Sequence, residues 1–272
     1  MSQQEKSKRF VALHERPGAF IIPNPWDGGS ARLLQGLGFE ALATSSSACA
    51  ANYGRRDGHV SRAEALAHAR AIVEATELPV AGDLEKGFGD SPEDAAATIR
   101  EAASIGLVGG SIEDASGRAD KPVYDIEHAT RRMEAAVAAA RALPFKFMLT
   151  GRAENFIRGN PDIEDTIRRL QAYERAGADV LFAPGLPDVE AVRRVCASIS
   201  KPFNFMAGIK GKSFPVQDLA AAGVKRVSLA GSLYRAAVTG MVEAAREVKE
   251  QGTFGYLDRS MASPDFNAAM KG

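Results

Sequence analysis

The chain has 272 residues, with 34 basic and 34 acidic side chains and therefore no formal net charge. This balance argues against nucleic-acid binding, which usually shows a basic excess or patch. No apolar run approaches the ~18 residues of a membrane helix, the first ten residues lack the apolar stretch of a signal peptide, and the two cysteines form no metal or disulfide pattern. We therefore expect a cytoplasmic protein that binds neither nucleic acid nor membrane.

Eight short apolar runs alternate with longer amphipathic segments along the chain. Continuous apolar runs of this length are typical of strands that are buried on both faces of a parallel sheet. The predicted strands are 19–23, 41–45, 79–83, 108–113, 145–151, 180–183, 203–207 and 227–230.

Helical patterns lie between these runs. Ser61 and Ser91 each stand three residues before an acid, as N-cap residues often do, and Gly177 is a good helix end. The predicted helices include 61–75, one that begins at Ser91, 124–141, 161–176, 187–197, 215–222 and 233–250.

The alternation of eight strands with helices predicts one (β/α)₈ barrel over residues 1–272, with a helical tail from about residue 252. A doubly wound open sheet is the main alternative. The Gly-x-Gly-x-x-Gly pattern typical of that fold does not follow the first strand, which weakens this alternative.

Acidic residues follow several of the predicted strands, at the barrel end where catalysis takes place. Asp57, Asp83, Glu85 and Glu113 should face one small cavity, with Arg152 opposite. A lone acid at a strand end is often only a helix cap, but like charges this close cannot all stay ionised without a counter-cation. Mg²⁺, which takes one or two carboxylates directly and keeps several waters, would meet this need and stabilise an enolate.

In this order and spacing, these residues resemble the isocitrate lyase/phosphoenolpyruvate mutase superfamily. The similarity runs from residues 23–27 to 229–232. Its most specific segments are residues 54–57, 82–89, 111–114 and 151–152.

The resemblance implies a role for each matching residue. Asp83 would bind Mg²⁺ (or Mn²⁺ as a substitute) directly, whereas Glu85, Glu113 and Asp57 would reach the ion through water. Arg152 would bind substrate oxygens, and Ser45, Ser46 and Ser47 would form the loop that receives the substrate carboxylate. The resemblance also implies a homotetramer, a dimer of dimers in which the last barrel helix is exchanged between neighbours.

The chain departs from the superfamily after the fourth strand. The lyases carry a Lys-Lys-Cys-Gly-His loop there, whereas residues 115–122 contain neither Cys nor His. The mutase gate is also absent, although Lys121 could take part of its catalytic role. The Glu after strand six and the Asn after strand seven of the lyases are missing as well. We therefore do not expect authentic isocitrate cleavage.

The metal-binding half of the chemistry is retained. We expect a carbon–carbon lyase that acts on a small 2-oxo or 2-hydroxy acid by retro-aldol cleavage or decarboxylation. Phosphorus–carbon chemistry and a non-catalytic binder of 2-oxo acids are the alternatives. The proton donor stays open among His59, Lys121, Arg118, Tyr124 and solvent.

Several further residues have a simple structural interpretation beside a functional one. Trp26 is as consistent with a pocket wall for the substrate as with core packing. Cys49 is interpreted as a small buried residue. His14, His68 and His128 fall in helical segments and are expected to be solvated.

Overall fold

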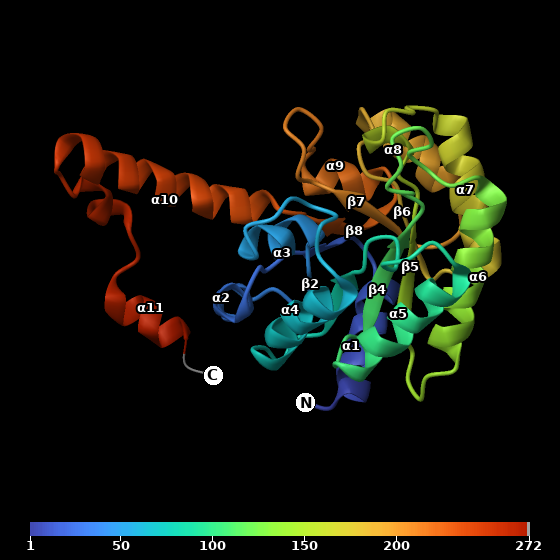
Figure 1. Cartoon of the computed structure of the whole chain (residues 1–272), viewed down its shortest axis with the longest axis horizontal. Coiled ribbons are helices and arrows are strands. Elements are labelled where there is room, and N and C mark those ends of the chain that lie inside the picture. Colours follow the sequence, from blue (N-terminus) through green and yellow to red (C-terminus); the bar gives the residue numbers. More distant parts are fainter. Residues whose placement is uncertain (271–272) are drawn as a thin grey trace.

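The computed structural model describes residues 1–270, and its eight parallel strands form one sheet. The strand order is β1-β8-β7-β6-β5-β4-β3-β2. Helices alternate with the strands (Figure 1). A backbone hydrogen bond of 3.0 Å from Ala43 to the carbonyl of Pro23 links the two ends of the sheet, which therefore forms a nearly closed barrel. The predicted (β/α)₈ fold is confirmed.

The observed strands lie within or close to the predicted runs. They are β1 Phe20–Ile22, β2 Leu42–Ala43, β3 Val80–Asp83, β4 Gly109–Glu113, β5 Met148–Arg152, β6 Val180–Phe182, β7 Phe203–Met206 and β8 Val224–Ser228. The prediction for the eighth strand was wrong by three residues at its start. Lys225 and Arg226 interrupt the apolar pattern there, yet Arg226 is only 6% exposed and lines the inside of the barrel.

The helices begin and end where local chemistry favours it. Ser61 and Ser91 form capping boxes with Glu64 and Asp94, and Gly177 ends its helix in the left-handed conformation. The helices are α1 Gln3–Glu15, α2 Gly28–Gly36, α3 Ser46–Asn52, α4 Arg62–Glu74, α5 Pro92–Ser104, α6 Ile126–Arg141, α7 Ile163–Ala176, α8 Val189–Ala197, α9 Val216–Ala221, α10 Ser232–Gln251 and α11 Ser263–Ala269, with short 3₁₀ turns η1 Asn155–Ile157 and η2 Gly255–Arg259.

Helix α1, for which the sequence analysis gave no bounds, packs against the barrel. Its Phe10 and Leu13 join an apolar cluster with Phe20 of β1, Val108 and Met148. His14 of the same helix is 5% exposed, so the expectation that it is solvated was wrong.

The other two helical histidines are not freely solvated either. His68 and His128 are half-buried, and a ring nitrogen of each lies 2.7 and 2.8 Å from the carbonyl oxygens of Trp26 and Asp90, respectively. Both side chains therefore tie loops to helices.

Helix α10 leaves the barrel and projects away from it (Figure 1). None of its residues is buried, and Met241, Val242 and Val248 are exposed. The chain then turns at Gly252 and returns, so that α11 contacts α2. The last two residues of the predicted tail, 271 and 272, lie outside the described residues. Within residues 1–270, no helix is long and apolar enough to cross a membrane.

The buried His14 should make stability depend on pH. Burial, and then the charge of Arg226, lowers the pKa of His14 to about 3. Below pH ~6.5 the unfolded chain takes up a proton that the folded chain refuses, so stability is lost as the pH falls from there toward 3. This linkage amounts to about 2 kcal/mol at pH 5.

We expect the melting temperature of His14→Gln to fall less between pH 7 and pH 5 than that of the wild type. Differential scanning calorimetry measures both. His59→Gln, which removes an exposed imidazole, is the control and should follow the wild type. An equal fall in all three proteins would contradict the assignment.

Candidate active site

Three charged side chains meet because their strands are neighbours. Asp83, Glu113 and Arg152 end β3, β4 and β5, and Glu113 is directly in register with Arg152. Parallel strands bring their carboxyl ends to the same rim of a barrel. The structure thus brings together the residues that the sequence predicted to meet.

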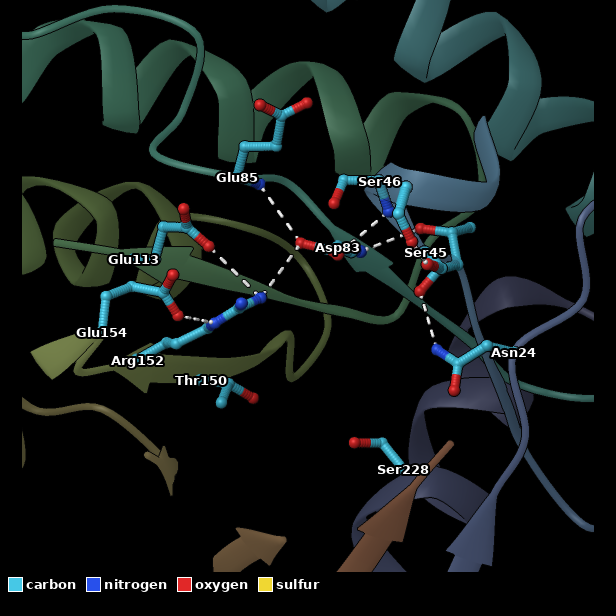
Figure 2. Close-up of polar contacts among 12 residues, drawn as sticks. Asn24, Ser45, Ser46, Asp83, Glu85, Glu113, Thr150, Arg152, Glu154 and Ser228 are labelled. Atoms are coloured by element: carbon cyan, nitrogen blue, oxygen red, sulfur yellow. Dashed lines mark hydrogen bonds and ion pairs between the residues drawn. The ribbon is translucent and has the colours of Figure 1, made fainter. Parts of the chain in front are cut away.

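Arg152 lies at the centre of this group (Figure 2). Its Nη1 is 3.2 Å from Glu113 and 3.7 Å from Asp83, and its Nε donates to Glu154 at 2.5 Å. The guanidinium also lies 4.9 Å over the ring of Phe182. Burial lowers the pKa of Arg152, but the three carboxylates outweigh it and the pKa is raised. Arg152 therefore stays a fixed cation.

Two other members of this ion-pair network, Glu154 and Arg158, had no predicted role. Glu154 is fully buried, and its second oxygen accepts from Nε of Arg158 at 3.0 Å. Arg158 also lies 3.4 Å from Glu113. The only sequence signal was the spacing of four residues between Glu154 and Arg158 beyond the fifth strand, where η1 forms a helical turn. Two arginines and two glutamates thus alternate across the rim.

Asp83 is held in place from three sides. Its Oδ2 accepts from the backbone N–H of Ser46 at 3.0 Å, and its Oδ1 accepts from that of Glu85 at 3.4 Å. Its own N–H donates to the hydroxyl of Thr44 at 2.8 Å. These bonds set the direction of the carboxylate before any ligand binds.

The serine segment differs from the loop that we expected. Ser45 caps helix α3, with its hydroxyl 3.0 Å from that of Ser47, and Ser46 and Ser47 form the first helical turn. The N–H of Ser46 is already bonded to Asp83. The segment therefore orients Asp83, in addition to any role in binding a carboxylate.

The remaining acids repel one another. Burial, followed by the charges of Asp83 and Asp57, raises the pKa of Glu85 to about 7. Loss of water around its carboxyl, and then the charge of Asp83, raises the pKa of Asp57, although the residue as a whole is exposed. Burial also raises the pKa of Glu113. The site is thus short of positive charge.

These side chains face a cavity of about 290 Å³. It is large enough for a small acid, although at the low end of ligand pockets. Its lining combines acids with cations and includes Ser46, Asp57, His59, Glu85, Lys86, Glu113, Arg152 and Arg158.

The donor set fits a hydrated metal ion but forms no closed cage. Among residues 1–270, no group of three or more His, Cys, Asp or Glu is arranged to hold a metal. Mg²⁺ does not need such a group, because it keeps several waters and binds one or two carboxylates. The raised pKa values of Glu85, Asp57 and Glu113 are the expected sign of negative charge that a cation would relieve.

The comparisons with known proteins agree with this geometry. The family model described as phosphoenolpyruvate phosphomutase matches residues 10–249. The chain belongs to this family. The 2-methylisocitrate lyase of Shewanella oneidensis is 32% identical over 76% of this chain and 73% of its own length.

Two solved structures of the family extend the comparison. A Burkholderia cenocepacia J2315 protein assigned to the lyases or mutases is 50% identical, with a TM-score of 0.96 over 98% of this chain and 96% of that one. A 2,3-dimethylmalate lyase is 26% identical, with a TM-score of 0.88 over 98% and 95% of the two chains. The chain is therefore an enzyme of the isocitrate lyase/phosphoenolpyruvate mutase type.

Several predicted site residues do not line the acidic cavity of this family member: Asp83, Ser45, Ser47, Lys121 and Trp26. Lys121 is exposed and pairs with Asp125 at 3.2 Å. Its loop is closed by a bridge between Ala115 and Val123. Trp26 is half-buried and packs edge-on against Tyr234 at 5.7 Å. Neither side chain lines the cavity in this arrangement.

The buried carboxylate of Glu154 should be essential for the ion-pair network. Glu154→Gln keeps the shape but leaves Arg152 and Arg158 with one anion fewer, which should cost about 3 kcal/mol of folding free energy. Glu190→Gln breaks an exposed pair with Arg193 and should change stability by less than about 0.5 kcal/mol. Urea unfolding compares the two variants, and equal losses would show that the network is not structural.

Proposed function

We propose that this chain is a Mg²⁺-dependent lyase that cleaves a carbon–carbon bond of a small 2-oxo or 2-hydroxy dicarboxylic acid through an enolate. The observation that carries the proposal is the fixed Arg152 beside Asp83, surrounded by acids with raised pKa values. Relatives named 2-methylisocitrate lyase and 2,3-dimethylmalate lyase support the reaction type.

The four predicted metal-binding acids would have different roles. Asp83 would bind the ion directly, and Glu85, Glu113 and Asp57 would hold its waters. When bound, Mg²⁺ supplies positive charge beside the developing enolate oxygen. The chain itself provides the pre-oriented carboxylate of Asp83, so little reorganisation is needed on binding.

The two arginines can recognise the acid groups of the substrate. Nη2 of Arg152 and Nη1 of Arg158 have no hydrogen-bond partner in the part of the chain that the structure describes. Guanidinium groups bind carboxylates in a planar, directional way. Two such groups on one cavity favour a dicarboxylate over a monocarboxylate.

Metal dependence and bond cleavage can be tested together. A panel of 2-oxo and 2-hydroxy dicarboxylates, with phosphonates included, is assayed for release of pyruvate, glyoxylate, CO₂ or phosphate. We expect a dicarboxylate to be cleaved with Mg²⁺, and both EDTA and Asp83→Ala to lower kcat/KM by about 100-fold or more.

The control variant for this assay is Glu127→Ala, an exposed acid of α6, which should keep wild-type activity. A folded Asp83→Ala protein that keeps full activity without added metal would contradict the proposal. Phosphate release from a phosphonate instead would favour phosphorus–carbon chemistry.

We also propose that the chain assembles as a homotetramer through α10 and the tail. An isolated helix of this length is marginally stable in water, and packing usually stabilises it. The exposed side chains of Met241, Val242, Val248, Phe254 and Leu257 would then be covered by a neighbour.

Light scattering during size-exclusion chromatography tests the assembly. We expect a mass near four times 28.9 kDa, and smaller species for the double variant Met241→Asp/Val248→Asp. Leu37→Asp, at an exposed leucine of the α2 end, should leave the mass unchanged. A monomeric wild type rules the proposal out.

A further inference from the structure

A second, smaller cavity of about 60 Å³ lies inside the barrel. Asp83 and Arg152 line one part of it, so it adjoins the candidate active site. Small residues such as Ala43, Ala81 and Gly110 leave the space open, where barrel interiors usually hold larger branched side chains. The cavity is also lined by Arg226, which the proposed reaction does not use.

Arg226 is bound only by neutral partners. Its Nε donates to Asn204 Oδ1 at 2.7 Å, its Nη2 to Thr150 Oγ1 at 3.1 Å and its Nη1 to His14 Nε2 at 3.3 Å. Nδ1 of His14 lies 2.8 Å from the carbonyl of Phe10, which can only accept. Nδ1 therefore carries the proton, and Nε2 is a neutral acceptor.

This arrangement leaves the charge of Arg226 uncompensated. A guanidinium has five N–H groups, and only three are used here among residues 1–270. Arg226 forms no ion pair in that range, whereas the buried Arg169 contacts Asp114 at 3.0 Å and Asp165 at 2.7 Å. Burial accordingly lowers the pKa of Arg226 to about 9, while the pKa of Arg169 is raised.

Further donors line the same cavity. The hydroxyl of Thr150 accepts from Arg226, and no acceptor for its own hydrogen lies within hydrogen-bonding distance in the described chain. The half-buried Ser111 also lines this cavity, and its hydroxyl has no hydrogen-bond partner among residues 1–270. A buried cation whose N–H groups lack acceptors is costly. An anion in this cavity could accept hydrogen bonds from the free N–H groups of Arg226.

We propose that this barrel cavity binds one small inorganic anion, of the size of chloride, on the free N–H groups of Arg226. The volume admits an ion or a few waters, whereas a substrate-sized acid needs a space nearer that of the 290 Å³ cavity. The anion completes the charge balance of the barrel interior. This proposed anion site goes beyond the proposed lyase reaction, and the proposal does not depend on that reaction.

Bromide, a heavier halide that scatters anomalously, locates the site directly. We expect one anomalous peak in wild-type crystals soaked in sodium bromide, within about 3.5 Å of Nη1 or Nη2 of Arg226. Because the measurement needs no turnover, its failure is distinct from a failure of the lyase proposal. A cavity that holds only water would overturn the anion site.

Thermal unfolding tests the same site in solution at constant ionic strength. Replacing sodium gluconate, whose anion is too large for the cavity, by sodium chloride should raise the wild-type Tm in a saturable way, by about 2–4 °C. Arg226→Met should abolish this dependence. Lys225→Met, at the neighbouring position of β8, should retain it.

Thr150→Val provides a second variant that keeps the charge of Arg226 but removes one hydroxyl. It should weaken the chloride dependence, and it keeps the test valid if Arg226→Met does not fold. Equal Tm values for the wild type in chloride and gluconate would overturn the proposal.

Discussion

The ion pairs of Arg152 with Glu113, Glu154 and Asp83 are the interaction on which the candidate site depends. They join the ends of three adjacent strands, and Arg152 lines both neighbouring cavities. An isolated carboxylate in such a place would be neutralised by desolvation. The guanidinium lowers the pKa of the neighbouring carboxyl groups, but burial and the repulsion between acids outweigh it, so the pKa values of Glu85, Asp57 and Glu113 are raised.

The sequence predicted those features that follow from periodicity and from position along the chain. The apolar runs identified the strands, and the acids after them had to meet because parallel strands share an end. The sequence-based prediction failed where a contact with a residue far along the chain determines burial more strongly than the local apolar pattern. Arg226 was left out of the predicted strand 227–230, and His14 was expected to be solvated, yet each provides the hydrogen-bond partner that allows the other to be buried. Glu154 and Arg158 were missed because a turn, and not a strand, positions them.

Other wrong predictions concern the conformation of loops. Residues 45–47 were expected as an open loop, but the Ser45 hydroxyl and the small residues after it favour a short helix. Lys121 was placed near the reaction on the basis of family position alone. The pairing of Ala115 with Val123 and the ion pair with Asp125 direct its side chain to the surface. Spacing along a sequence does not determine which way a loop folds back.

The arginines in and around the barrel lie in two kinds of environment. Arg152 and Arg169 are surrounded by carboxylates, so their charges are balanced by the chain itself and their pKa values rise. Arg226 is surrounded by Asn204, Thr150 and His14, none of which carries a charge. A carboxylate beside Arg226 would have added another negative charge beneath a site that already holds more acids than it can ionise. A mobile anion balances Arg226 without that fixed charge, and the space left by the small residues of β2, β3 and β4 provides room for it.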